Sequence, residues 1–448
     1  MGVRFQSFSK RFREHFLRGT RSVALQAQMY LQGLMQAHRK NMERMEEVVP
    51  DCIYQSLQHF ISDSEWDTRA VLDQVAREAD RHLGGSESSC LLIDESSFQK
   101  KGSSSVGVDR QWSGRLGKVE NCQVAVFASL AQGVSSTLID TRLYLPQKWI
   151  QAPERCRAAG VPQSEVVLKS KADLAFEMVV QARRNGVRFR WVGVDGGYGK
   201  EPGFLRRLED HGEVFVADVH KDQQIYVEDP VPSVPEKKGG RGKKPLRLQA
   251  HTTSQRVDAW AAAQPPELWQ EVAVRPGTQG EVRVEALHGR VWLWDGREQK
   301  ARFWHVVVSR EVSSPGTIKY ALSNAPAQTS MKRLVQMQRQ RFWIERSFED
   351  GKSESGLADY QVRGWRAWHH HMALVMMAML FMLEEKLVHK QSYPLLSCAD
   401  IETLLAHFLP RRDVTVEEVV RQMKARHQAR QKAIESAYRR QRSGSQGR

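Results

Sequence analysis

Three carboxylates stand out in this chain of 448 residues because of the residues around them. Asp94 ends the apolar run CLLID and Asp195 ends WVGVD, so each is predicted at the C-terminal end of a strand, where α/β sheets concentrate ligand-binding groups. Glu345 belongs to a predicted helix. Together they would form an all-oxygen site suited to Mg²⁺ or Mn²⁺. Two such ions about 4 Å apart can activate a nucleophile and stabilise the leaving oxygen of a phosphodiester.

The predicted helix around Glu345 carries charges of both signs on one face. In QRQRFWIERSFEDGKSE, positions 341, 345, 348 and 352 are spaced four, three and four residues apart. At about 100° per residue they fall within roughly 60° of one another, so Arg341, Glu345 and Lys352 can point at one site. The two cations would neutralise phosphate there. The alternative is a plain i,i+4 ion pair between Arg341 and Glu345, worth a few tenths of a kcal/mol.

Both aspartates are followed by segments that suit a phosphate site. Asp195 precedes Gly196, Gly197 and Gly199, which give backbone freedom where space is short. For either aspartate alone the alternative is an ordinary turn, because Asp commonly starts turns. The segment after Asp94 is dense in cations that are candidate DNA or phosphate ligands: Lys100, Lys101, Arg110 and Lys118.

The hydrophobic pattern predicts the elements that must position these residues. Apolar residues recur at helical spacing through residues 1–85. A helix is predicted at 170–186, which Ser170 can cap and Gly186 can end. Short apolar runs predict strands at 90–93, 122–130, 136–145, 188–194 and 213–219. Three strands, a helix and two more strands predict an α/β domain on a mixed sheet.

Beyond residue 220 the composition changes. Residues 230–247 are rich in Pro, Gly, Lys and Arg, which predicts a flexible basic loop, and alternating strands of a β-rich insertion follow. The chain turns helical again from Ser330. These changes predict a helical N-terminal DNA-binding region (1–85), a catalytic core (86–220 and 329–390) interrupted by the insertion (221–328), and a basic helical C-terminal region (391–448).

The apolar run Met372–Leu383 has no charge, but twelve residues rise only about 18 Å as a helix. A bilayer core is about 30 Å thick, so the run predicts a buried helix and no membrane span. The five cysteines are scattered without a C-x-x-C pair, and no secretory apolar segment opens the chain. We therefore expect a cytoplasmic protein.

Charge indicates the class of partner. Lys and Arg number 67 against 52 Asp and Glu, a net charge of +15. Such an excess favours nucleic acid first and an anionic membrane surface second, because neutralised phosphates release condensed counterions. The N-terminal segment FQSFSKRFREHF predicts a basic amphipathic helix that lies on DNA or on the protein's own core, with an organelle transit peptide as a further alternative.

Several blocks together resemble bacterial insertion-sequence transposases of the DDE type. They are LLIDESSFQKKGSSSVGVDRQWSGRLGKVENCQVAVF, LYLPQKWIQAPERCRAAGVPQ, WVGVDGGYG and the helix around Glu345, in a resemblance that runs from roughly Gly33 to Trp368. The branch is the one with a Tyr-Arg-Glu-Lys signature and an insertion before the last carboxylate. Arg341 and Lys352 match the signature, whereas Gln338 occupies the position of its tyrosine.

The resemblance implies an RNase H-like core in which Asp94, Asp195 and Glu345 bind two Mg²⁺ or Mn²⁺ ions. It implies a transposase that binds terminal inverted repeats in double-stranded DNA, cuts there and joins the 3′ ends to target DNA. It also implies a homodimer in the synaptic complex and a place at the bacterial nucleoid. Insertion aromatics hold a flipped base in some relatives, which makes three tryptophans candidates, with core packing as the alternative: Trp292, Trp294 and Trp304.

Two other functions remain open on the sequence. One is a non-catalytic DNA-binding regulator descended from a transposase, which the intact carboxylate trio argues against. The other is a stand-alone metal-dependent nuclease, over which the basic arms and the insertion favour transposition. Asp218 also lies near a strand end but has no comparable motif beside it, and the consecutive residues His369, His370 and His371 point in different directions around a helix, which argues against a metal site.

Overall fold

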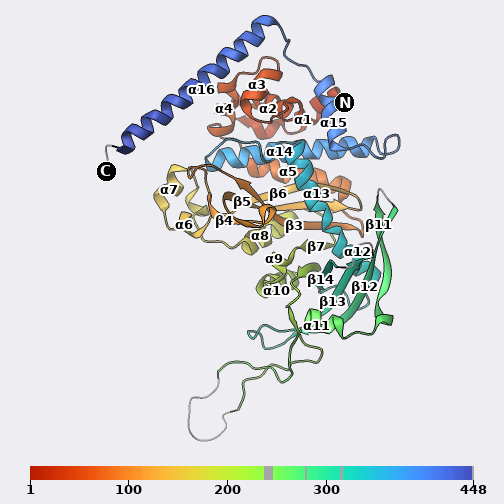
Figure 1. Cartoon of the computed structure of the whole chain (residues 1–448). Helices are drawn as coiled ribbons and strands as arrows, with labels where there is room; N and C mark the ends of the chain where they lie inside the picture. The colour runs from red at the N-terminus through yellow and green to blue at the C-terminus, as the bar shows by residue number, and fades with distance from the viewer. Residues whose placement is uncertain (237–245, 278–279, 313–315, 446–448) are drawn as a thin grey trace.

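The computed structural model describes residues 1–236, 246–277, 280–312 and 316–445 (Figure 1). A mixed sheet of ten strands runs through the molecule, and helices cover both of its faces. The helices within residues 2–62 form a separate layer above α14 (Trp365–Val388), so that this helix is enclosed between them and the sheet. Residues 237–245, half of the predicted basic loop, lie outside the described residues.

The part of the sheet outside the β-rich segment is organised around β3 (Ser89–Gln99). This strand pairs antiparallel with β5 on one side and parallel with β7 on the other, while β5 pairs with β4 and β6, and β7 pairs in parallel with β8. These strands are β4 (Asp109–Ser113), β5 (Lys118–Gln132), β6 (Ser135–Leu143), β7 (Trp191–Val194) and β8 (Phe215–Val219). The arrangement is that of an RNase H-like core and confirms the predicted α/β class with a mixed sheet.

The strand that carries Asp94 does not end at that residue. The prediction of a strand end at Asp94 was wrong, because β5 continues to pair with β3 as far as Gln99, opposite Cys122. The parallel neighbour β7 does end there, at Val194. Asp94 therefore lies inside β3, at the level where its neighbouring strand stops and the sheet edge opens.

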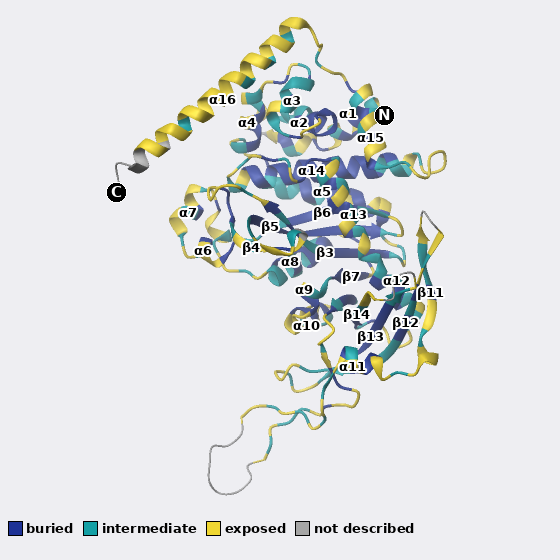
Figure 2. Ribbon diagram, viewed as in Figure 1, coloured by how far each residue is buried: buried dark blue, intermediate teal, exposed yellow. Residues whose placement is uncertain are grey.

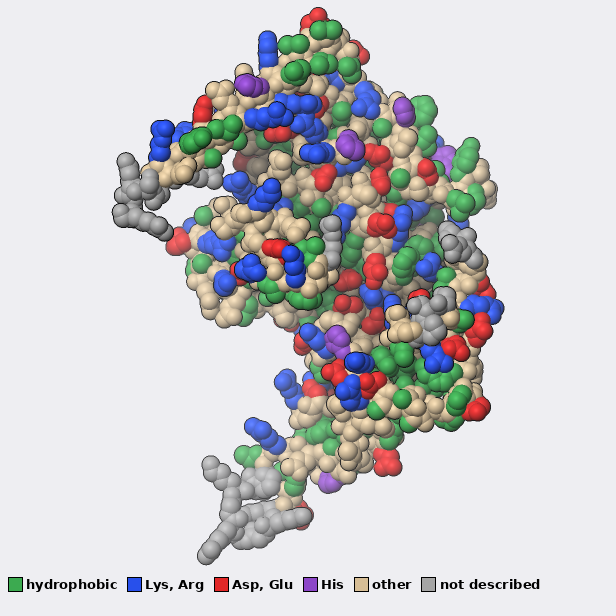
Figure 3. All heavy atoms as spheres, in the orientation of Figure 1, with side chains coloured by type: hydrophobic (Ala, Val, Ile, Leu, Met, Phe, Trp, Pro, Cys, Tyr) green, Lys and Arg blue, Asp and Glu red, His purple; other side chains and the backbone are tan. Residues whose placement is uncertain are grey.

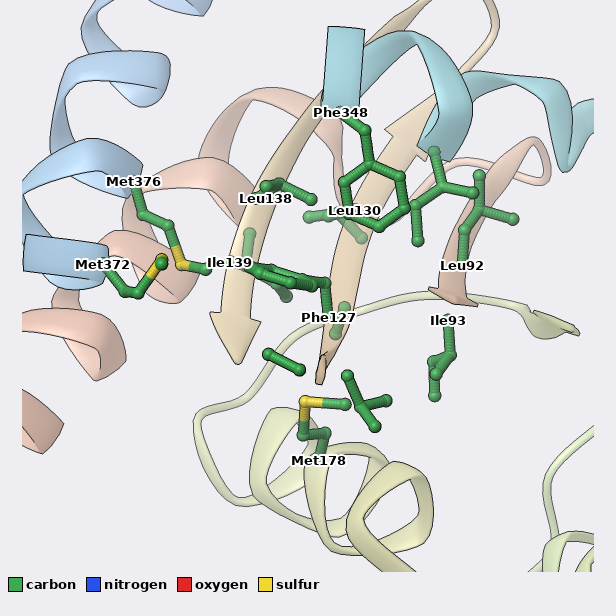
Figure 4. Packing of buried hydrophobic residues seen from close by; sticks show 14 of the residues in the cluster. Leu92, Ile93, Phe127, Leu130, Leu138, Ile139, Met178, Phe348, Met372 and Met376 are labelled. Carbon is green, nitrogen blue, oxygen red and sulfur yellow. The ribbon is translucent and has the colours of Figure 1, made fainter. Parts of the chain in front are cut away.

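The half of the sheet around β3 is buried on both faces. Every residue of β5 from Cys122 to Ala131 is buried, which explains its nearly continuous apolar sequence. On one face lies α8 (Lys171–Arg184), and on the other lie α13 (Phe342–Ser353) and α14. Figure 4 shows Phe348 of α13 and Met178 of α8 on opposite sides of these strands.

The helix α8 begins and ends where the sequence predicts. Ser170 accepts a hydrogen bond from the backbone N–H of Asp173, and the Asp173 carboxylate accepts one from the backbone N–H of Ser170, which completes a capping box. Gly186 follows the helix at φ +76°, a left-handed conformation that glycine adopts without strain. The short helices α6 (Gln147–Ile150) and α7 (Pro153–Ala158) connect β6 to this segment.

The β-rich segment continues the core sheet. Its last strand, β14 (Ile318–Ser323), pairs antiparallel with β8, with Leu322 opposite Ala217. The remaining elements are β9 (Gln224–Ile225), β10 (Gln255–Arg256), α11 (Val257–Ala262), β11 (Gln270–Gly277), β12 (Gly280–Leu293) and β13 (Arg302–Glu311). The predicted boundary between core and insertion near residue 220 remains a prediction, since one sheet spans it.

The helix predicted around Glu345 is interrupted. The helix α12 (Met331–Gln340) ends one residue before Arg341, and α13 begins one residue after it. Arg341 itself keeps helical torsion angles, φ −54° and ψ −26°, so the expected face is still shared by Arg341 and the residues of α13.

The N-terminal basic helix lies on the protein's own core, one of the two places that the sequence left open. Phe5 and Phe8 of α1 (Gly2–Arg11) are buried, and each ring contacts Phe381 of α14. Arg4 and Arg11 of the same helix form ion pairs with Glu385 and Glu384. The other helices of this layer are α2 (Ala24–Gln36), α3 (Met42–Val48) and α4 (Tyr54–Ser62), and β1 (Leu17–Arg18) and β2 (Arg21–Ser22) form a short ribbon beside them. The next helix, α5 (Thr68–Leu83), lies beside α14 and packs directly on β5 and β6 of the sheet.

The predicted buried helix is confirmed, since every residue of Met372–Leu383 in α14 is buried. Within the described ranges, none of the helices combines the length and apolarity that a bilayer crossing requires. The chain ends in α15 (Cys398–Phe408) and α16 (Val416–Ser445), and α16 projects from the body with most of its surface exposed (Figure 2). All five cysteines are buried free thiols.

Candidate active site

Adjacent parallel strands place Asp94 and Asp195 side by side. In the register of β3 and β7, Ile93 pairs with Val194, so the residue that follows each of them is an aspartate. Asp195 also caps α9 (Gly196–Gly199), and its Oδ1 accepts backbone hydrogen bonds from Gly197 and Tyr198 at 3.0 and 3.3 Å. The sheet therefore fixes both carboxylates before any ligand binds.

A glycine allows the turn after Asp195 to lie against the next strand. A Cβ built on Gly199 would lie 1.9 Å from the carbonyl oxygen of Asp218 in β8, which no side chain could tolerate. The sequence predicted that glycine gives backbone freedom where space is short. At Gly199 this freedom allows the backbone to approach β8 closely.

The environment raises the pKa of Asp94 to about 7. Burial is the largest cause, and the negative charge of Asp195 is the second. Arg341 opposes both effects, since its guanidinium favours the ionised carboxylate. The negative charges of the two aspartates are therefore poorly solvated at this site, and a bound cation would compensate them.

The guanidinium of Arg341 lies between three carboxylates. Its Nη1 is 3.4 Å from Asp94 Oδ2, its Nη2 is 3.0 Å from Glu345 Oε1, and its Nε is 3.0 Å from Asp218 Oδ2. Burial lowers the pKa of Arg341, but the three carboxylates outweigh that effect and raise it. The i,i+4 ion pair between Arg341 and Glu345 thus exists, but Arg341 also pairs with Asp94 and Asp218.

Asp218 is the residue that the sequence analysis set aside. It lies in β8, and its pKa is raised by burial, with Arg341 opposing that shift. The position near a strand end was visible in the sequence. Its partners were not, because Arg341 lies between α12 and α13, more than a hundred residues away, and because β8 meets β7 only in the folded sheet.

A cleft of about 1110 Å³ contains the three predicted carboxylates and Arg341. It is lined by Asp94, Asp195, Arg341 and Glu345, and also by Phe348 and Lys352, so the structure brings the predicted triad and both signature cations to one place. The Lys352 ammonium is 5.6 Å from the centre of the Phe348 ring. The side chain of Glu345 is about half exposed (53%), so this carboxylate is the most exposed of the three.

Residues that the sequence analysis missed also line the cleft. Trp112 is 54% exposed, an unusual state for so large an apolar side chain. The hydroxyl of Tyr198 is buried and lacks a hydrogen-bond partner among the described residues. Lys171 forms an ion pair with Glu95 at 2.7 Å. Trp112 lies within the block VDRQWSGRLGK. Its position beside the predicted cations was the only feature of the sequence that could have identified it as a residue of the cleft.

The four predicted phosphate-binding cations do not share one environment. Lys100 is partly buried, with its ammonium 3.6 Å from the centre of the Tyr360 ring, and burial lowers its pKa to about 8. The other three are exposed: Lys101, Arg110 and Lys118. Figure 3 shows basic and acidic side chains interspersed over the visible face of the molecule. Arg110 and Lys118 belong to the hairpin of β4 and β5, whose Trp112 lines the cleft.

The three candidate tryptophans lie at the junction of the insertion and the core. Trp304 is 4% exposed and donates a hydrogen bond to Glu209 at 2.8 Å, so its ring belongs to the core. Trp292 packs on Phe303 with ring centres 4.6 Å apart. Trp294 lines a second cavity of about 560 Å³, which Trp304 also borders.

Among the residues that the structure describes, no group of three or more His, Cys, Asp or Glu side chains is arranged to hold a metal ion. Arg341 lies among the carboxylates that would bind such an ion. The donor set nevertheless fits a hard divalent cation, because it consists of carboxylate oxygens and because the neighbouring charge of Asp195 raises the pKa of Asp94.

The three consecutive histidines serve different elements of the core. His370 bonds to the backbone oxygen of Ile61 and His371 to that of Gly356, while His369 bonds to the oxygen of Trp365 in its own helix. Burial lowers the pKa of all three to about 4.

Comparisons with known proteins match this architecture. A family model described as DDE superfamily endonuclease matches residues 11–281, more than half of the chain, and the match includes Asp94 and Asp195 but ends before Glu345. A protein of Microchaete diplosiphon described as a probable transposase for insertion sequence element IS701 is 22% identical over 326 residues. That alignment covers 72% of this chain and 73% of the relative.

Proposed function

The chain belongs to the DDE superfamily endonuclease family, and on this basis we propose that it is a DNA transposase. It binds the terminal inverted repeats of an insertion sequence, cleaves phosphodiesters there and transfers the 3′-hydroxyl ends to target DNA. The observation that carries the proposal is the convergence of Asp94, Asp195 and Glu345 on one cleft that also contains Arg341 and Lys352. The description of the Microchaete diplosiphon relative supports transposition over simple nuclease activity.

The three carboxylates would hold two Mg²⁺ or Mn²⁺ ions, since DDE superfamily endonucleases generally use divalent metals. When bound, such ions activate a water or a 3′-hydroxyl and stabilise the leaving oxygen. Asp94 and Asp195 supply rigid ligands, because the sheet and the start of α9 fix them. Glu345 supplies the adjustable one, because its side chain is half exposed.

The cations of the cleft orient the phosphate. Arg341 presents a planar guanidinium that can bind two phosphate oxygens at once, and Lys352 adds a second positive charge from the same helix face. Phe348 lies between these groups and packs on Phe127 with ring centres 5.3 Å apart. This apolar contact anchors α13 to the sheet and keeps its charged face towards the cleft.

Double-stranded DNA is the proposed partner. Lys101, Arg110 and Lys118 are exposed and would neutralise phosphates beside the cleft. Arg4 and Arg11 of the N-terminal helix are paired with glutamates of α14, so the basic C-terminal helix α16 is the better candidate for a DNA-binding arm.

Of the three tryptophans, Trp294 is the best candidate to hold a flipped base, because it borders a cavity and its ring is only partly buried. Trp304 is buried, which favours a core role for it. We further propose that two copies act together on the paired DNA ends, and that the protein works at the nucleoid in the bacterial cytoplasm.

The deciding experiment incubates the purified protein with Mg²⁺ and DNA that carries the ends of its element, beside an Asp94→Asn variant. We expect metal-dependent cleavage and strand transfer by the parent protein only. Equal cleavage by the variant would refute the site assignment. A parent protein that binds the ends but never cuts them with Mg²⁺ or Mn²⁺ would instead identify a DNA-binding regulator, and cleavage without strand transfer would identify a nuclease.

A further inference from the structure

The strongest anchor of Arg341 lies outside the predicted triad. Its Nε donates to Asp218 Oδ2 at 3.0 Å, a shorter contact than the 3.4 Å to Asp94. Both partners are largely buried, with side chains 15% and 16% exposed. Glu345, the remaining partner, is half exposed and therefore holds the guanidinium less firmly.

A second layer of side chains fixes Asp218. Gln338 Nε2 donates to its other oxygen, Oδ1, at 3.3 Å, and Gln338 Oε1 accepts a hydrogen bond from Ser309 Oγ at 2.8 Å. Gln338 and Ser309 are 3% and 0% exposed. A continuous chain of contacts therefore runs from β13 through α12 to β8 and ends at the guanidinium in the cleft.

We propose that Asp218 is a positioning residue for Arg341, an inference that rests on the proposed function. When Asp94 and Glu345 hold a divalent cation, Arg341 would lose two of its three carboxylate partners. A guanidinium left unpaired in this setting would oppose metal binding, because a buried charge without a partner is strongly unfavourable. Asp218 remains available, so the arginine keeps a partner and its two Nη groups are released towards the phosphate.

This arrangement gives a role to the residue at the tyrosine position of the signature. Gln338 is buried behind Asp218 and hydrogen-bonds to protein groups on both sides. In this chain the position therefore supports Arg341 through Asp218, in place of a contact with DNA.

The first test measures Mn²⁺ binding by calorimetry without DNA, for the parent protein and for Asp218→Asn. We expect the variant to bind Mn²⁺ about tenfold more weakly, because Arg341 then competes for Asp94 and Glu345. In cleavage assays with Mg²⁺, kcat should fall by about tenfold or more, whereas KM for DNA should stay within about twofold. Glu285→Gln is the matched control, since it breaks the ion pair with Arg310 on the same sheet and should change neither quantity.

A double-mutant cycle separates positioning from independent action. If Asp218 acts through Arg341, the variant with both Asp218→Asn and Arg341→Gln should cleave no more slowly than Arg341→Gln alone. Additive losses would overturn the proposal. Gln338→Leu, which removes the support of Asp218 without changing a charge, covers the case in which Asp218→Asn does not fold. It should weaken Mn²⁺ binding in the same direction by a smaller factor.

The outcomes distinguish this proposal from the proposed function. Parent protein that cleaves while Asp218→Asn binds Mn²⁺ and cleaves equally well would refute only the positioning role. Parent protein that binds Mn²⁺ more tightly than Asp218→Asn but never cleaves DNA would support the positioning role and refute the transposase. Parent protein that does not bind Mn²⁺ would contradict both.

Discussion

Asp94 and Asp195 lie next to each other because Ile93 and Val194 are partners in adjacent parallel strands. This register is the basis of the site, since it brings two negative charges together where β7 ends. Burial, and after it the negative charge of Asp195, raises the pKa of Asp94 to about 7.

The contribution of Asp94 to folding stability without metal should decrease as pH rises from about 4 to 7. Unfolded Asp titrates near 3.9, so in this range the folded protein retains a proton on Asp94 that the unfolded chain has lost. The Asp94→Asn variant lacks this penalty and should be more stable than the parent protein at pH 8, by on the order of 1 kcal/mol, with a smaller difference near pH 4. Thermal unfolding in chelator at both pH values measures this, and a difference independent of pH would contradict it.

Glu345→Gln should abolish cleavage without harming the fold. Its carboxylate is half exposed, and an exposed ion pair contributes only about 0–1 kcal/mol, so the melting temperature should change little. Cleavage should fall by at least about a hundredfold, since a proposed metal ligand is lost. Glu349→Gln on the same helix, which is 67% exposed and pairs with Arg346, is the control and should cleave normally. Comparable losses in both variants would show that α13 tolerates no change of charge.

Gln338→Tyr, which restores the residue of the signature, should impair this protein. The larger ring must enter a site that is 3% exposed, and overpacking of a filled core costs about 1–3 kcal/mol. The substitution also removes the amide that donates to Asp218. Thermal unfolding and Mn²⁺ titration should both show a loss, whereas a gain in activity with unchanged stability would favour a direct DNA contact at this position.

Neutralising the exposed cations near the cleft should reduce the salt dependence of DNA binding. Each phosphate contact contributes about 0.9 to the slope of log K against log salt, so replacing Lys101, Arg110 and Lys118 with Gln should reduce the slope by about 2 to 3. Binding isotherms at several salt concentrations measure the slope. Lys10→Gln, an exposed change on α1, serves as the control. An unchanged slope in the triple variant would place the DNA on another surface.

Local patterns in the sequence determined a large part of this molecule. The spacing of Arg341, Glu345 and Lys352 follows from helix geometry, and the apolar runs before Asp94 and Asp195 follow from burial of the central strands. The capping box at Ser170 and the buried run in α14 are likewise local properties. Such features depend on residues that are near one another in the chain, which is why periodicity and motif could predict them.

Only the tertiary structure decided which distant groups meet. The sequence placed Asp218 near a strand end but could not show that β8 stands next to β7, or that Arg341 turns its Nε towards it. It offered Lys100 as a phosphate ligand, but it could not show that the Lys100 ammonium lies 3.6 Å from the centre of the Tyr360 ring. Strand order and side-chain partners depend on pairing between segments far apart in the chain, and pairing of this kind leaves no periodic trace in a single sequence.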